Sequence, residues 1–210
     1  MGFSSLIDIL GSTIVGGLLL MILLRMNDAS VENNYLYSGE RIVQQNLVEV
    51  VKLIEYDFRK IGYCKDWTKI NQAFAIISAD SNQISFQTDI VNTTAANDYG
   101  DGEVDTLRYY LGSTSELSAT PNPNDRLLYR VINGAAPKGS NLGVTQFKLT
   151  YFDALGDTIS PLPPSPPLSI ATIQVDIAVE NPAAYENNYS ADRRAIWRQI
   201  KLAARNFSKR

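Results

Sequence analysis

The first stretch of the chain, residues 3–24, is apolar apart from a single charged residue, Asp8, and Arg25 follows it. A helix of this length rises about 33 Å, which is enough to cross the hydrocarbon core of a bilayer. Removable signal peptides have a basic start and a small-residue cleavage site after the apolar run. This chain has neither feature, so the pattern predicts a retained transmembrane helix.

Asp8 lies inside this apolar run. A carboxylate at the centre of a membrane helix costs about 2.5–3.5 kcal/mol, and less near the interface, where it can contact water. Asp8 therefore either lies at the level of the lipid headgroups or pairs with a cation inside an assembly, such as the N-terminal amine of a neighbouring subunit. The sequence pattern leaves both explanations open.

The pattern changes after Arg25. Residues 26–39 are mostly polar, and from Glu40 onward apolar residues recur at spacings of three and four. Such a stripe is typical of a helix that packs one face on a core, and Gly62 is a residue that commonly ends a helix. We expect one long helix with a transmembrane half (3–25) and an amphipathic half (26–62). The apolar stripe comprises Val43, Leu47, Val50, Val51, Ile54, Phe58 and Ile61.

The remainder, residues 63–210, reads as a β-rich domain. Short alternating segments are separated by turn-forming residues, and residues 160–167 hold five prolines, which favour an extended loop. Periodicity alone allows either a helix or a strand for residues 193–205. The expected strands are residues 73–78, 83–88, 105–111, 127–132, 144–152 and 170–179.

Composition excludes several kinds of site. The chain has 210 residues and a net charge of −3, so bulk electrostatics does not favour nucleic acid. It has no histidine, which removes Ser-His-Asp and Cys-His nucleophile pairs and most zinc sites. Cys64 is the sole cysteine, and we expect a small buried side chain rather than a reactive thiol. We expect no enzymatic activity, no catalytic residue and no cofactor.

Several phrases occur in an order that resembles the type IV pilin-like, or prepilin-type, family. Residues 2–8, Gly-Phe-Ser-Ser-Leu-Ile-Asp, look like its processing motif Gly-Phe-Thr-Leu-Ile-Glu. The helix end at 56–63 and the strand phrases at 105–111, 144–152 and 197–206 follow in the family's order. Within the family, the chain is most similar to the W-type minor pilins and to the J-type minor pseudopilin of type II secretion.

The resemblance implies an α+β fold, in which the long helix packs its amphipathic half on an antiparallel sheet and the tail is a strand. It also implies cleavage between Gly2 and Phe3, with residues 1–2 as the remnant of a leader, and methylation of the new amine. In the family that amine pairs with an acid during assembly. Counted from Phe3, the acid is the sixth residue, Asp8, where the family has Glu at the fifth. Phe3 and Asp8 are therefore the expected assembly residues.

The implied function is structural: a minor pilin or pseudopilin at or near the tip of a type IV pilus-like filament or a type II secretion pseudopilus. Its partners would be other pilin-like subunits, a prepilin peptidase and membrane lipid, and no nucleic acid. Before assembly it would be a single-pass inner-membrane protein, with residues 63–210 on the periplasmic or extracellular side. One alternative is an anchored β-rich binding domain that never polymerises. A membrane-anchored hydrolase is disfavoured by the missing histidine and nucleophile motif.

Residues 97–105 hold a group of carboxylates, the kind of oxygen ligand that calcium takes. Their spacing differs from that of an EF-hand, so we expect a solvated turn and no metal. If a calcium ion does bind here, its candidate ligands are Asp98, Asp101, Glu103 and Asp105.

Cations gather near the C-terminus, and two explanations apply: a solvated strand face or a contact with DNA. The acidic balance of the chain favours a solvated face. These residues are Arg193, Arg194, Arg198, Lys201, Arg205, Lys209 and Arg210.

Overall fold

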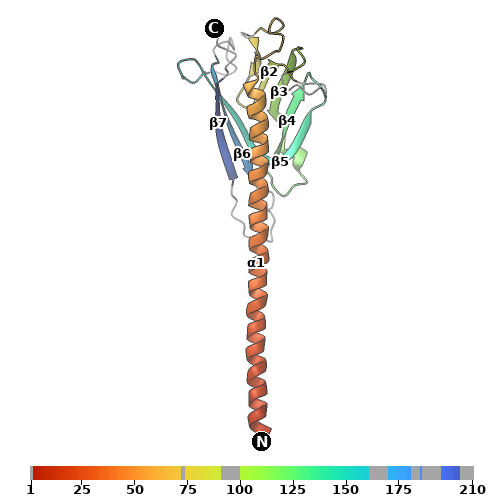
Figure 1. Ribbon diagram of the computed structural model, residues 1–210, viewed down its shortest axis with the longest axis vertical. Helices are drawn as coiled ribbons and strands as arrows, with labels where there is room; N and C mark the ends of the chain where they lie inside the picture. Colours follow the sequence, from red (N-terminus) through yellow and green to blue (C-terminus); the bar gives the residue numbers. More distant parts are fainter. Residues whose placement is uncertain are drawn as a thin grey trace. The chain divides into compact units, whose positions relative to one another are not determined.

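The chain has an α+β fold, as predicted, in which one helix is followed by an antiparallel sheet. Helix α1 (Gly2–Arg59) runs through two compact units, Met1–Arg41 and Ile42–Arg210 (Figure 1). The computed structural model describes residues 2–71, 74–90, 100–160, 170–180, 185 and 195–203.

In the first unit, α1 has no buried side chain among those described. Its apolar part is long enough to cross a membrane, and none of that part is covered by the rest of the chain. Large apolar side chains from Phe3 to Met26 are more than half exposed. Exposed apolar surface on this scale marks a contact with lipid or with another protein.

In the second unit, α1 buries the predicted stripe. All seven stripe residues are at most 6% exposed, so the predicted face is confirmed. Phe58 packs edge-on against the rings of Phe86 and Tyr109, with centroids 5.5 and 5.7 Å away. The helix ends at Arg59, three residues before the expected end, because Gly62 turns away at φ +74° and donates its N–H to the Gln87 carbonyl (2.9 Å).

The described strands form one seven-stranded antiparallel sheet, in which spatial order follows chain order. A short 3₁₀ helix, η2 (Thr114–Leu117), lies between the third and fourth strands. The strands are β1 (Ile76–Ala79), β2 (Gln83–Thr88), β3 (Asp105–Leu111), β4 (Arg126–Ile132), β5 (Lys138–Phe152), β6 (Thr172–Glu180) and β7 (Ala195–Ala203).

Sequence patterns located most of these strands, and β2 and β3 have the predicted bounds. The tail forms a strand, β7, paired along β6. β5 begins six residues earlier than expected, because residues 138–143 pair with β4 through the backbone although their side chains do not alternate. β1 begins three residues later than expected, at Ile76.

Gly143 divides β5 into two halves. The first half pairs with β4 and the second with β6, and the register shifts between Val144 and Gln146. Gly143 has φ +72°, and a Cβ added there would lie 2.6 Å from the Glu180 carbonyl oxygen. Glycine is therefore required where the strand changes partner.

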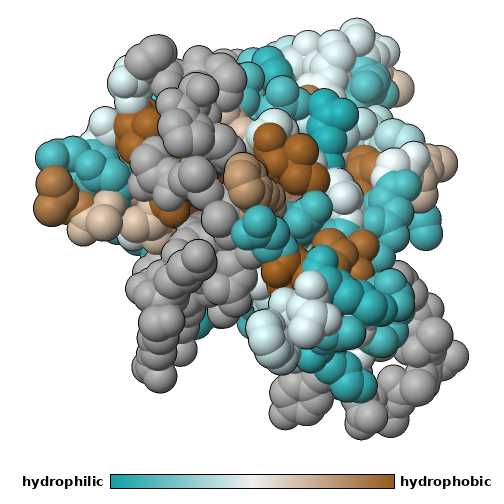
Figure 2. All heavy atoms as spheres, turned by 90° about the horizontal axis from the view of Figure 1, so that it is seen from above, coloured by the Kyte–Doolittle hydropathy of each residue, from teal (hydrophilic) through white to brown (hydrophobic). Residues whose placement is uncertain are grey.

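The sheet curls so that the β1–β2 turn meets β5. The Leu149 N–H donates to the Ser81 carbonyl (2.7 Å), and the Tyr151 hydroxyl donates to the Asp80 carbonyl (2.8 Å). The inner face, with Phe86, Leu107 and other buried side chains, packs around α1. Over the face of the molecule in Figure 2, the coloured hydrophobic side chains occur in small groups among hydrophilic ones.

Candidate functional site

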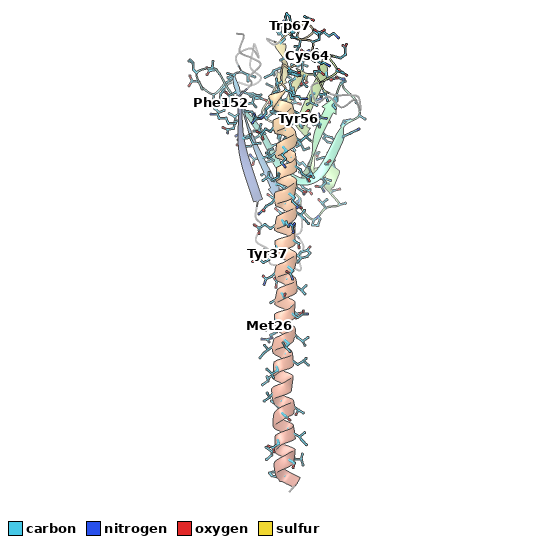
Figure 3. All side chains as sticks on the ribbon, viewed as in Figure 1. Met26, Tyr37, Tyr56, Cys64, Trp67 and Phe152 are labelled. Carbon is cyan, nitrogen blue, oxygen red and sulfur yellow. The ribbon has the colours of Figure 1, made fainter. Side chains whose placement is uncertain are left out.

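The predicted assembly residues lie in the first turns of α1. Gly2, Phe3 and Asp8 are all helical, Phe3 is 82% exposed and Asp8 is exposed. Five positions along a helix rotate a side chain by about 140° around the axis, so Phe3 and Asp8 lie on different sides. The helix therefore does not bring them together within one chain. Further along α1, the side chains of Met26 and Tyr37 project outward (Figure 3).

A buried polar cluster joins α1 to the sheet. The carboxylate of Asp57, 2% exposed, accepts hydrogen bonds from the Tyr109 hydroxyl and from Arg130 Nε (2.7 Å) and Nη2 (3.1 Å). Tyr109 and Arg130 are direct partners across β3 and β4, so both side chains face the helix. The cluster fixes the last turn of α1 over these two strands.

Burial and charge shift the pKa values of both partners of Asp57. Burial raises the pKa of Tyr109, and the adjacent carboxylate of Asp57 raises it further. Burial alone would lower the pKa of Arg130, but its hydrogen bonds and ion pair with Asp57 outweigh that effect and raise it. The cluster thus holds a protonated phenol and a charged guanidinium around one carboxylate.

Sequence reasoning did not identify this cluster, because Asp57 looks like an ordinary polar helix residue. Its position gives a signal, however: Asp57 lies three residues after Ile54 and directly before Phe58, on the buried side of the stripe. A carboxylate at such a position needs a partner when it is buried.

A groove of about 420 Å³ lies beside this cluster, between α1 and the β4–β5 hairpin. Its size is in the range of ligand and anchor-residue pockets in proteins. Charged side chains lie among its largely apolar lining. The lining residues are Glu49, Val50, Leu53, Tyr109, Leu128, Arg130, Ile132, Ala135, Ala136, Lys138, Ser140 and Leu142.

The structure brings together a different set of carboxylates from the four candidate calcium ligands, Asp98, Asp101, Glu103 and Asp105. Carboxylate oxygens of Asp101 and Asp105 lie within 4.8 Å of each other and of Asp89, which the sequence did not single out. Glu103 instead pairs with Lys69, and Asp98 lies outside the described residues. Calcium binding at this loop stays a hypothesis.

The two buried carboxylates of that group have hydrogen-bond donors from the chain itself. Asp89 accepts the N–H groups of Lys65 (3.0 Å), Asp101 (2.9 Å) and Gly102 (2.9 Å). Asp105 accepts from the Ile90 N–H (2.9 Å). These donors offset the cost of burying the carboxylates and close the loop onto the end of β2.

Cys64 is buried, as expected, and burial raises the pKa of its thiol, with nearby Asp89 adding to the effect. Of the C-terminal cations, only Lys201 has a described side chain. It is exposed, and its Nζ lies 4.2 Å from the centre of the Phe152 ring. That position fits a solvated strand face.

No protein-family model and no curated protein sequence matches this chain. Among solved structures, a type IV-like pilin from Thermus thermophilus is similar to it, with a TM-score of 0.45 and 11% sequence identity. The match covers 79% of this chain and 98% of that chain.

Proposed function

We propose that this chain is a subunit of a type IV pilus-like filament or of a type II secretion pseudopilus, used as a minor pilin or pseudopilin at or near the tip. The observation that supports this most is the division of α1. One continuous helix exposes all its described apolar side chains in the first unit and buries its stripe against the sheet in the second. The exposed part needs lipid before assembly and neighbouring helices after it.

In this proposal a prepilin peptidase cleaves between Gly2 and Phe3, and the new amine is methylated. Residues 3–25 hold the subunit in the inner membrane, and residues 63–210 lie on the periplasmic or extracellular side. Asp8 then acts between chains, meeting the amine of a neighbour's Phe3.

The test compares Asp8→Asn with Asp8→Glu in cells that make the whole assembly system. Asn removes the charge and keeps the shape, so incorporation into filaments and co-purification with other pilin-like subunits should fall sharply. Glu keeps the charge, so it should assemble like the parent. In both variants the second unit should stay folded, because Asp8 lies outside it.

Intact mass gives an independent readout, since cleavage removes the first two residues. A subunit that keeps Met1 and Gly2, or an Asp8→Asn variant that assembles as well as the parent, contradicts the proposal. The chain would then be better described as an anchored β-rich binding domain that does not polymerise.

A further inference from the structure

We infer that the groove between α1 and the β4–β5 hairpin of one copy binds the helical segment Arg25–Tyr35 of a second copy. The inference rests on the proposed function, since assembly is what brings copies of α1 side by side. It adds a second contact, which starts at the last membrane-spanning residue, Arg25, and decides how copies fit together.

The groove offers an apolar floor with one charge of each sign at its rim. Glu49 comes from α1 and Lys138 from β5, and both side chains are exposed. Neither forms an ion pair within the described part of the chain. Arg130 also lines the groove, but Asp57 already neutralises it. An occupant should therefore present an acid to Lys138, a base to Glu49 and an apolar side chain between them.

The segment Arg25–Tyr35 carries this set of groups on one side of the helix. Arg25, Asp28 and Glu32 follow one another at spacings of three and four, which places them within about 60° around the axis. All three are exposed, and none has an ion pair among the described residues. Val31, 58% exposed, lies beside them and supplies the apolar side chain.

The groove and the segment Arg25–Tyr35 are complementary in charge, and both have apolar side chains. Asp28 and Glu32 meet Lys138, Arg25 meets Glu49, and Val31 enters the groove next to Leu53, which is 45% exposed on its own. The contact is heterologous, because each copy carries one groove and one segment. Two copies are enough to form it once, so a subunit used in few copies can still make it.

The inference can be tested by disulfide cross-linking of the full-length chain in filaments from cells that make the whole assembly system, in a Cys64→Ser background. Leu53→Cys in the groove and Val31→Cys in the segment should give linked dimers. The matched control replaces Val31→Cys with Ser30→Cys. Ser30 is exposed and lies about 100° around the helix from Val31 and about 160° from both Asp28 and Glu32, away from the charged side. We expect the control pair to give at least tenfold less dimer.

Charge reversal then separates specific docking from chance contact. Lys138→Glu alone, or Asp28→Lys with Glu32→Lys, should lower the yield of the Leu53–Val31 dimer at least tenfold. Combining the reversals on both sides should restore most of it. Equal yields from the control pair, no effect of charge reversal, or capture of a different subunit instead of a second copy would each overturn the inference.

A third link distinguishes this inference from the proposed function. Val15→Cys lies in the apolar part of α1 and reports whether the apolar parts of neighbouring helices meet in the same filaments. Dimers through Val15 without dimers through the groove would refute the groove contact and leave the filament role standing. Loss of both links would count against both proposals.

Discussion

Replacing Asp57 by alanine should strongly destabilise the second unit, Ile42–Arg210. The change leaves the Arg130 guanidinium, with 24% of its side chain exposed, and the buried Tyr109 hydroxyl without their acceptor. Breaking a buried pair by removing one partner costs about 3–5 kcal/mol. Because Arg130 keeps some contact with water, we expect the lower end, about 3 kcal/mol. For a domain of this size, that lowers the melting temperature by about 6–12 °C.

Thermal unfolding of the full-length chain in detergent, followed by near-ultraviolet circular dichroism, measures this effect. The matched control is Glu55→Ala, which removes the exposed pair with Arg59 on the same helix and should cost about 0.3–0.5 kcal/mol. Similar melting temperatures for the two variants would refute the assignment of a buried charge cluster.

A triple variant, Asp57→Leu with Tyr109→Phe and Arg130→Met, tests the reason for the cost. It removes the charges together with their partners, and buried pairs replaced in this way often lose little stability. We expect it to recover most of the stability lost in Asp57→Ala. If it does not, the cost lies in packing rather than in an unpaired charge.

Two further predictions concern pH and backbone strain. The pKa of Tyr109 is raised in the folded chain, so protonated Tyr109 contributes to the free energy of unfolding. This contribution is fully present below the unfolded pKa of about 10. Above that pH it is lost by about 1.4 kcal/mol per pH unit. Tyr109→Phe should therefore flatten the alkaline loss of stability, measured as urea midpoints between about pH 9 and 11, and an unchanged slope would contradict this. Gly143→Ala should cost about 1–3 kcal/mol by denaturant unfolding, from positive φ and a clash with Glu180. Gly156→Ala, with φ +89° and no atom within 4 Å of the added Cβ, should cost less, and equal costs would mean that the clash is relieved.

The sequence predicted those parts of the fold in which the spacing of apolar and polar residues reflects which side chains are buried. The α1 stripe and the alternation in β6 were visible because the buried positions there hold apolar residues, with Asp57 on α1 as an exception. For residues 193–205, periodicity alone allowed a helix or a strand, and the family resemblance favoured a strand. The structure has the strand β7 there, paired along β6. The first half of β5 could not be predicted, because Lys138–Gly143 holds one large apolar residue, Leu142, and its side chains do not alternate.

The buried carboxylates of the candidate site could not be predicted from the sequence, for a related reason. Asp57 and Asp89 are buried charges, and burial of a charge depends on donors that come from distant parts of the chain. Arg130 lies 73 residues from Asp57, and the N–H groups of Asp101 and Gly102 reach Asp89 from 12 and 13 residues away. Apolar residues reveal burial through periodicity, but a single buried carboxylate has no period.

The strand order has a consequence for how the chain acquires its structure during synthesis. Because spatial order follows chain order, each strand pairs with the strand made just before it. A growing chain can therefore extend the sheet one strand at a time, and each pairing closes only the connection between consecutive strands, whose entropic cost grows slowly with its length. The contacts of β5 with the β1–β2 turn, through Leu149 and Tyr151, are the exception. They can form only after β5 has been made, so the curl of the sheet closes late, when more than two thirds of the chain is already present.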